Sequence, residues 1–99
     1  MVIVKNLVQK KMVSGENTSE FCLMFYILES IVEVDGNSVG TYGIQVDKLN
    51  FDETVVLERE KIFDITLERA EIEKFANTIS DCDVEPIILS DVVCDFVGV

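Results

Sequence analysis

The first part of the chain has the apolar and polar alternation of β-strands. Four segments are rich in β-branched and aromatic residues, and clusters of Gly, Asn, Asp and Ser, which favour turns, separate them. The predicted strands are residues 2–13, 20–34, 39–49 and 53–63, with polar turns at 14–19, 35–38 and 50–52. Lysines in the first strand favour an edge position, because lysine discourages pairing at a sheet edge.

The pattern changes from a period of two to a helical period near residue 66. Ile72, Phe75, Ala76 and Ile79 recur at the spacing of one helix face. This predicts an amphipathic helix over residues 67–80, capped by Thr66.

Beyond this helix, a proline interrupts the chain and a short second helix is expected. Pro86 blocks continuation, so residues 84–89 are predicted to be extended. Ser90 can cap a helix over residues 91–97 that ends at Gly98. Strands followed by helices predict an α+β fold in one domain, residues 1–99: an antiparallel sheet of about four strands, one amphipathic helix packed on one face, and a short C-terminal helix.

The turn between the second and third strands decides which side chains share a face. We place Asn37 at its centre, which sets Val32 and Leu28 beside the apolar side of the third strand, Tyr42 and Val46. The core face of the second strand is then the alternate set that includes Leu28. The opposite set, expected to stand in water, is Phe21, Leu23, Phe25 and Ile27. Because so large an apolar patch would gain from burial, we predict an oligomer interface there, in a homodimer. The alternative is that the first strand or the last segment folds over the patch within the same chain.

Composition removes most familiar chemistries. The 99 residues include 19 acidic and 8 basic side chains, a formal net charge of −11, and no histidine. The absence of histidine excludes Ser/His/Asp triads, Cys–His dyads and imidazole metal ligands. A strongly acidic chain is a poor ligand for nucleic-acid phosphates, so no nucleic-acid partner is expected, even at the lysines of the first strand.

The cysteines and the hydropathy pattern indicate a cytoplasmic protein. The odd number of cysteines, with no Cys-x-x-Cys pair, argues against a disulfide framework and favours buried free thiols in a reducing compartment. The longest apolar run, residues 21–28, is far shorter than the roughly 20 residues of a membrane span. The first residues do not resemble a signal peptide.

No group of residues predicts catalysis, a cofactor or a metal. Glycines at 40 and 43 lie within a strand with no helix after them, so they predict a bulge or a neighbouring aromatic ring rather than a phosphate loop. The turn at Asp35-Gly36 lacks the spacing of a calcium loop. The acidic clusters fall on turns and outer faces, where solvation accounts for them. Catalytic, cofactor and metal sites are all predicted to be absent.

A family resemblance runs through most of the chain. Tyr42-Gly43-Ile44-x-Val46, Asp64-Ile65-Thr66 and the pattern Val84-x-Pro86…Leu89-x-Asp91-Val92-Val93-x-Asp95-Phe96 carry it. They resemble a family of small, acidic, intracellular bacterial proteins of about 100 residues whose function is unknown. The resemblance implies the same order of strands and helices and brings no activity, substrate or cofactor.

Three functional hypotheses follow. The first is a small non-enzymatic cytoplasmic module that binds a protein partner or itself as a homo-oligomer. The second is an acidic decoy or inhibitor of a basic nucleic-acid-binding protein, which requires carboxylates gathered on one surface. The third, the least favoured, is an enzyme that uses carboxylates alone, which requires a closed pocket around at least one acid. No membrane partner is expected.

Overall fold

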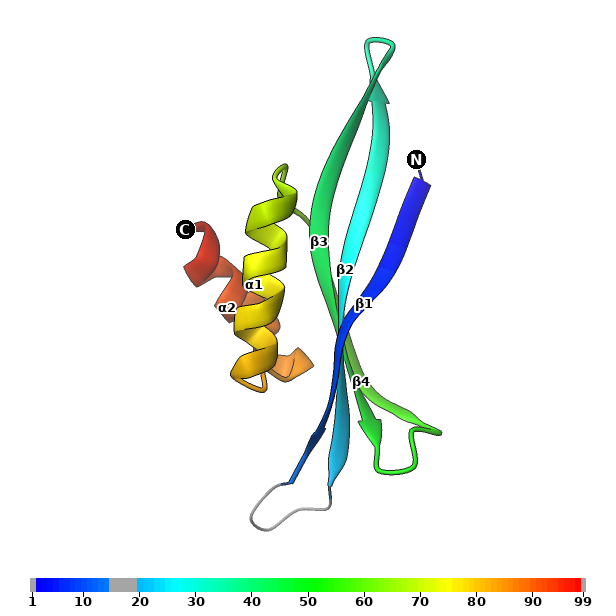
Figure 1. Cartoon of the computed structure of the whole chain (residues 1–99), viewed down its shortest axis with the longest axis vertical. Coiled ribbons are helices and arrows are strands. Elements are labelled where there is room, and N and C mark those ends of the chain that lie inside the picture. Colours follow the sequence, from blue (N-terminus) through cyan, green and yellow to red (C-terminus); the bar gives the residue numbers. More distant parts are fainter. Residues whose placement is uncertain (1, 15–19, 99) are drawn as a thin grey trace.

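The chain folds into an antiparallel sheet followed by two helices. The computed structural model describes residues 2–14 and 20–98, so most of the predicted turn at 14–19 lies outside the described residues. The strands are β1 (Val2–Val13), β2 (Phe21–Val34), β3 (Asn37–Asn50) and β4 (Val56–Thr66). They are followed by α1 (Arg69–Asp81), the 3-10 turn η1 (Pro86–Ile88) and α2 (Leu89–Val97). The strands pair in sequence order, β1-β2-β3-β4, and both helices lie on one side of them (Figure 1), which confirms the predicted α+β class.

The turn between β2 and β3 is tighter than predicted. Asp35 and Gly36 both have positive φ, 51° and 80°, as in the two-residue turns that suit the twist of a hairpin. Val34 therefore faces Asn37, and Val32 pairs with Val39 rather than with Tyr42. The predicted register, centred on Asn37, is wrong by an odd number of residues, and an odd offset exchanges the two faces of a strand.

The corrected register reverses the predicted faces of β2. Phe25 pairs with Val46 and Ile27 with Ile44, and these side chains are buried under α1 together with Leu23. Leu23 and Phe25 are both 0% exposed. Phe21 is partly buried and packs against the same core. The prediction that this set stands in water as an oligomer interface is therefore wrong, because the chain's own helices cover it.

Helix α1 confirms the predicted apolar face. Ile72, Phe75, Ala76 and Ile79 are buried, and α1 contacts all four strands. The helix begins at Arg69, two residues later than predicted. The predicted cap, Thr66, lies just before it: its hydroxyl oxygen accepts a hydrogen bond from the backbone N–H of Glu68 at 3.1 Å.

The C-terminal segment departs from the predicted extended conformation. Pro86 opens the 3-10 turn η1, a position where its missing N–H is not needed, and α2 follows directly from Leu89. Ser90 is therefore inside α2 rather than at its cap. Gly98 ends the helix with a φ of 75°, as predicted. The rings of Phe75 and Phe96, 4.4 Å apart, join α2 to α1.

The β2–β3 hairpin extends past its neighbours. The pairing of β1 with β2 stops at Ile31, and that of β4 with β3 stops at Tyr42. Residues 32–39 thus form a two-stranded ribbon that projects from the body, at the top of Figure 1, along the 53 Å long axis of the molecule.

Candidate functional site: the open face of the sheet

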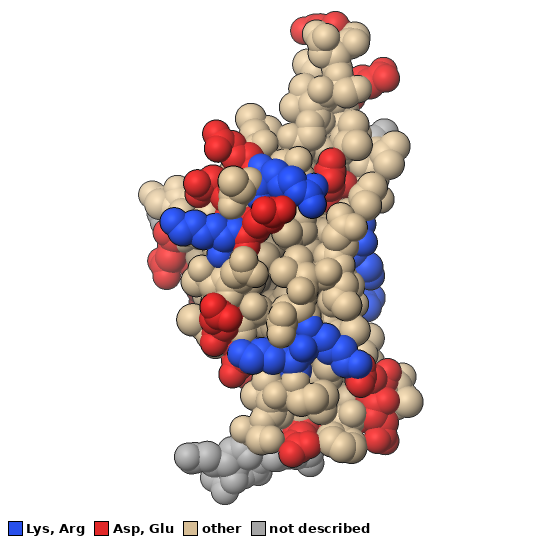
Figure 2. All heavy atoms as spheres, in the orientation of Figure 1, with Lys and Arg blue, Asp and Glu red and all other residues tan. Residues whose placement is uncertain are grey.

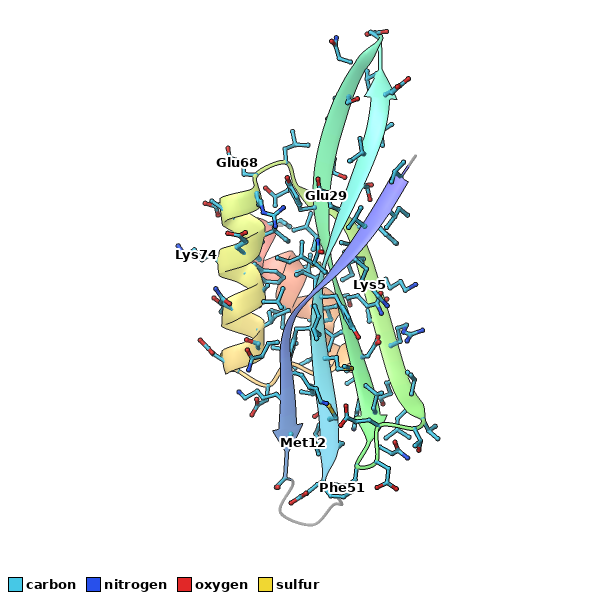
Figure 3. All side chains as sticks on the ribbon, turned by 45° about the vertical axis from the view of Figure 1, so that its right-hand side comes forward. Lys5, Met12, Glu29, Phe51, Glu68 and Lys74 are labelled. Atoms are coloured by element: carbon cyan, nitrogen blue, oxygen red, sulfur yellow. The ribbon has the colours of Figure 1, made fainter. Side chains whose placement is uncertain are left out.

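The side of the sheet opposite α1 and α2 is not covered by a helix of the described chain. We call it the open face and define it by the alternating residues that the strand registers place there. They are Ile3, Lys5, Leu7, Lys10 and Met12 of β1; Cys22, Met24, Tyr26, Leu28 and Ser30 of β2; Thr41, Gly43, Gln45, Asp47 and Leu49 of β3; and Arg59, Lys61 and Phe63 of β4. Figure 3 shows Lys5 and Met12 on β1, and Lys74 on the separate helix α1.

An ion pair between buried Asp47 and exposed Arg59 lies at the centre of the open face. Asp47 is only 3% exposed although no helix among the described residues covers it. The guanidinium of Arg59 donates two hydrogen bonds to its carboxylate, at 2.8 and 3.0 Å, and the side-chain amide of Gln45 donates a third at 2.9 Å. The hydrogen bond to Asp47 raises the pKa of Arg59 above its usual value. Both oxygens of the carboxylate thus accept hydrogen bonds from neighbouring side chains, which is typical of a structural ion pair.

Tyr26 lies beside this ion pair and makes a cation–π contact with Lys5. The ammonium of Lys5 sits 4.6 Å from the centre of the Tyr26 ring. The Tyr26 hydroxyl donates a weak hydrogen bond to the sulfur of Met24 at 3.5 Å. Burial, and then the charge of Asp47, raise the pKa of Tyr26, so the hydroxyl stays protonated at neutral pH.

Large apolar side chains surround the polar centre and are exposed. Ile3, Leu7, Met12 and Phe63 are 47%, 51%, 46% and 41% exposed. Ile3 and Phe63 line a shallow hollow of about 250 Å³ with Ser30 and Asp64. Three of these side chains come from β1 and one from β4, and exposed apolar groups gathered on one face are characteristic of an interaction surface.

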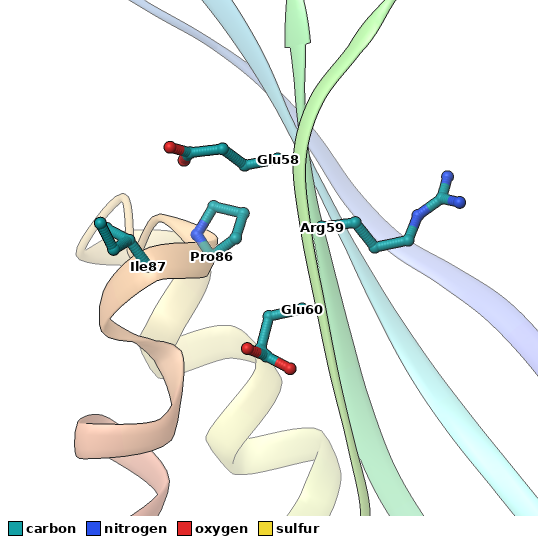
Figure 4. Close-up of a pocket in the computed structure, with 5 residues that line it drawn as sticks. All are labelled: Glu58, Arg59, Glu60, Pro86 and Ile87. Atoms are coloured by element: carbon teal, nitrogen blue, oxygen red, sulfur yellow. The ribbon is translucent and has the colours of Figure 1, made fainter.

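Acidic and basic side chains of β4 point to opposite sides of the sheet. On β4, Glu58 and Glu60 point toward η1, whereas Arg59 points to the opposite side (Figure 4), with Lys61 one alternation further along. The open face holds four of the eight basic residues, Lys5, Lys10, Arg59 and Lys61. The acid of this set is Asp47, which Arg59 neutralises, and the neighbouring Asp64 accepts a hydrogen bond from Thr41 of the open face.

A second feature is a cleft between β4 and η1. It has a volume of about 270 Å³ and is lined by Glu58, Glu60, Pro86, Ile87 and the Arg59 segment (Figure 4). One carboxylate oxygen of Glu58, Oε2, is buried without a hydrogen-bond partner among the described residues. The cleft presents two carboxylates, but the side chain of Arg59 points away from it, so it offers no cation to polarise a substrate.

The cysteines divide into two kinds. Cys22 is buried on the open face, as predicted for a free thiol. Cys82 and Cys94 are exposed, which corrects the prediction that all three are buried. Within residues 2–14 and 20–98, no group of three or more Cys, Asp or Glu side chains is placed to hold a metal ion. In the same residues, no helix is long and apolar enough to cross a membrane.

The sequence pattern predicts part of this surface. The alternation of Thr41, Gly43, Gln45 and Asp47 on one side of β3 was predicted, but that side was expected to be wet, and Gln45 and Asp47 are buried. The partner of Asp47, Arg59, comes from the next strand. Only the β3–β4 register brings the two together, and no local pattern signals it.

The fold and its surface define a small α+β domain: a four-stranded antiparallel meander with helices on one face and a mixed apolar and basic face on the other. A family model described as "Family of unknown function (DUF6514)" matches residues 4–99, so the chain belongs to this family. The resemblance seen in the sequence, to a family of small proteins of unknown function, is thereby confirmed. Comparisons with curated proteins and with solved structures returned no match.

Proposed function

We propose that this protein is a non-enzymatic binding module and that the open face is its binding surface. The observation that carries the proposal is the exposure of Ile3, Leu7, Met12 and Phe63 together on the uncovered side of the sheet. Burying four such side chains in an interface contributes several kcal/mol to binding, at roughly 1.5–3 kcal/mol for each fully buried side chain. The two exposed thiols, Cys82 and Cys94, suit a reducing compartment, so we place the module in the cytoplasm.

The alternative hypotheses have less support. A decoy requires carboxylates gathered on one surface, but on the face seen in Figure 2 acidic side chains are interspersed with lysines and arginines. Ion pairs join Lys11 to Asp83 and Arg69 to Glu73. An enzyme using carboxylates alone would have to work in the cleft at Glu58, which lacks a cation. Self-association stays a prediction, but the residues first assigned to its interface are buried in the core or packed against it.

Site-specific photo-crosslinking tests the proposal. A benzophenone amino acid replaces Leu7 on the open face, and in a matched variant it replaces Leu67, which is 66% exposed in the loop between β4 and α1. We expect the protein in its own host cells to form a discrete adduct from position 7 and none from position 67. No adduct from position 7, or equal labelling from both positions, would contradict the proposal. The mass of the adduct also separates a second copy from a different protein.

A further inference from the structure

The open face ends at a free sheet edge, and that edge carries an alternating pattern. β1 is the first strand in the order β1-β2-β3-β4, so its outer side has no strand neighbour among the described residues. Along its open-face side the residues alternate between apolar and basic. In order they are Ile3, Lys5, Leu7, Lys10 and Met12, with a register shift between Leu7 and Gln9.

Edge lysines alone would only deter pairing, but this edge is also apolar. Val2 and Val4 are exposed in addition to Ile3, Leu7 and Met12. A long, exposed and apolar edge strand is a template for another strand, and proteins usually avoid one. Residues 1–13 contain no acid, and two of their three lysines, Lys5 and Lys10, lie on the open face, whereas Lys11 lies on the other side and pairs with Asp83. The edge therefore attracts acidic strands and repels basic ones.

We propose, on the basis of the binding function proposed above, that β1 accepts an extended segment of another protein as a fifth strand of the sheet. In such β-augmentation the main-chain hydrogen bonds supply affinity and alternate side chains supply specificity. Directly opposed side chains on neighbouring strands lie about 4.5–5.5 Å apart, so opposite charges and apolar pairs stabilise the pairing. The segment thus carries acidic residues opposite Lys5 and Lys10 and apolar residues opposite Ile3, Leu7 and Met12.

The same charges disfavour a second copy of this chain on the open face. Packing two open faces against each other would bring Lys5, Lys10 and Lys61 of each copy into one interface. Arg59 is already paired with Asp47, so it is the one cation of the face whose charge is offset by a buried acid. Lys10 has only the exposed Glu53 of the β3–β4 turn, at 2.5 Å. A strand that supplies acids avoids this repulsion.

Three synthetic peptides as long as β1, 12 residues, test the inference. In all of them the side chains on the side that continues the open face alternate between apolar residues and a second residue type, as they do along β1. The second type is Glu in the first peptide, Gln in the second and Lys in the third. We expect the Glu peptide to bind about tenfold or more tightly than the Gln peptide, and the Lys peptide to bind weakest. Added salt should reduce the difference. Fluorescence anisotropy measures affinity, and the methyl NMR signal of Met12 reports contact with the open face.

Strand addition has its own signature. The Glu peptide should protect from hydrogen exchange those β1 amides that point away from β2. A version N-methylated at the residues that face β1 should lose binding, because it lacks the required donors. Lys5→Glu with Lys10→Glu should reverse the preference toward the Lys peptide. The matched charge reversal Lys74→Glu, on α1, should leave it unchanged.

The outcomes separate the two proposals. If all three peptides shift Met12 equally, or bind without protecting β1, the open face binds but the fifth-strand inference is wrong. If sedimentation shows a dimer that Leu7→Glu abolishes, the occupant is a second copy, and the inference is likewise wrong. If no peptide shifts Met12, no dimer forms and position 7 gives no crosslink, the binding function itself is refuted.

Discussion

At the scale of single residues, Gly43 shows how one position shapes the open face. The pairing of β3 with β4 shifts between Tyr42 and Ile44, so β4 bulges beside Gly43. A Cβ placed on Gly43 would lie 2.1 Å from the carbonyl oxygen of Ile62 and 2.8 Å from Cα of Phe63. The absent side chain lets the β4 backbone approach closely, which places Phe63 beside the hollow near Ile3. Of the predicted bulge or aromatic neighbour at the two glycines, a bulge is confirmed at Gly43, where it lies in the paired strand β4. No atom lies within 4 Å of a Cβ added to Gly40.

Gly43→Ala should therefore destabilise the fold. The methyl group would displace backbone atoms, and overpacking of this kind costs about 1–3 kcal/mol. Gly40→Ala is the matched control in the same strand, because no atom lies within 4 Å of its added Cβ. Urea unfolding followed by circular dichroism measures both variants. Equal stability of the two would show that the close approach at Gly43 is relaxed at little cost.

The three thiols should react differently. Cys22 is 0% exposed, and burial raises its pKa, so the thiol is both shielded and protonated at pH 8. Cys82 and Cys94 are exposed. A thiol reagent such as dithionitrobenzoate should label Cys82 and Cys94 in the folded protein and all three cysteines in denaturant. Mass spectrometry of digested protein assigns the sites. Rapid labelling of Cys22 in the folded state would contradict its burial.

The same thiol gives the stability a pH dependence. Because the pKa of Cys22 is raised on folding from its ordinary value of 9.0, the folded state holds this proton more tightly than the unfolded chain does. Stability is therefore unaffected well below pH 9 and falls as the pH rises above it. Cys22→Ala should flatten this decline in urea titrations between pH 8 and 10. An identical slope in the variant would assign the decline to other groups, among them Tyr26.

At the scale of elements, the strands and the main helix could be predicted from the sequence, but the register could not. The helical spacing of Ile72, Phe75, Ala76 and Ile79 is strong because tertiary packing uses that same face. The strands were found from their β-branched residues. The faces of β2 were reversed because every residue from 21 to 28 is apolar, so alternation carried no information there. The turn Asp35-Gly36 held the deciding signal, since this dipeptide favours a two-residue hairpin turn.

Hydrogen exchange along β2 should reveal where the sheet is supported. Residues 23–27 are flanked by β1 and β3 and lie under α1, whereas residues 32–34 belong to the projecting ribbon and pair only with β3. A two-stranded ribbon alone is marginally stable, so its amides should exchange by local opening, much faster than those of residues 23–27. NMR-detected exchange measures each amide. Uniform protection along β2 would mean that the ribbon is held by contacts beyond its own pairing.

At the scale of the whole molecule, the two sides of the sheet differ in what covers them. One side holds the core, from Leu23, Phe25 and Ile27 to the apolar face of α1 and to Leu89 and Val93 of α2. The other side is organised around an internally satisfied ion pair and leaves its apolar groups exposed. The candidate site could not be predicted from the sequence. Which side of the sheet is exposed depends on the strand register and on the side that the helices cover.

Truncating a side chain should therefore cost much stability on the core side of the sheet and little on the open face. Phe25→Ala removes a fully buried ring and should cost about 3–5 kcal/mol, a large fraction of the roughly 5–15 kcal/mol that stabilises a small domain. Leu7→Ala, at a side chain 51% exposed, should change the unfolding free energy by less than about 0.5 kcal/mol. Thermal melting and circular dichroism compare them. A loss of stability in Phe25→Ala as small as that in Leu7→Ala would show that the core is not centred on β2.

The sequence order of the strands has a consequence for biosynthesis. Every strand pairs with its predecessor through a hairpin, so the sheet can assemble stepwise as the chain leaves the ribosome. The residues that cover its apolar side, α1 and α2, emerge last. During this interval the nascent sheet exposes Leu23, Phe25 and Ile27 to solvent. Ribosome-stalled chains ending before Arg69 should thus engage chaperones, and chains extended past Val97 by a linker that clears the exit tunnel should be released from them.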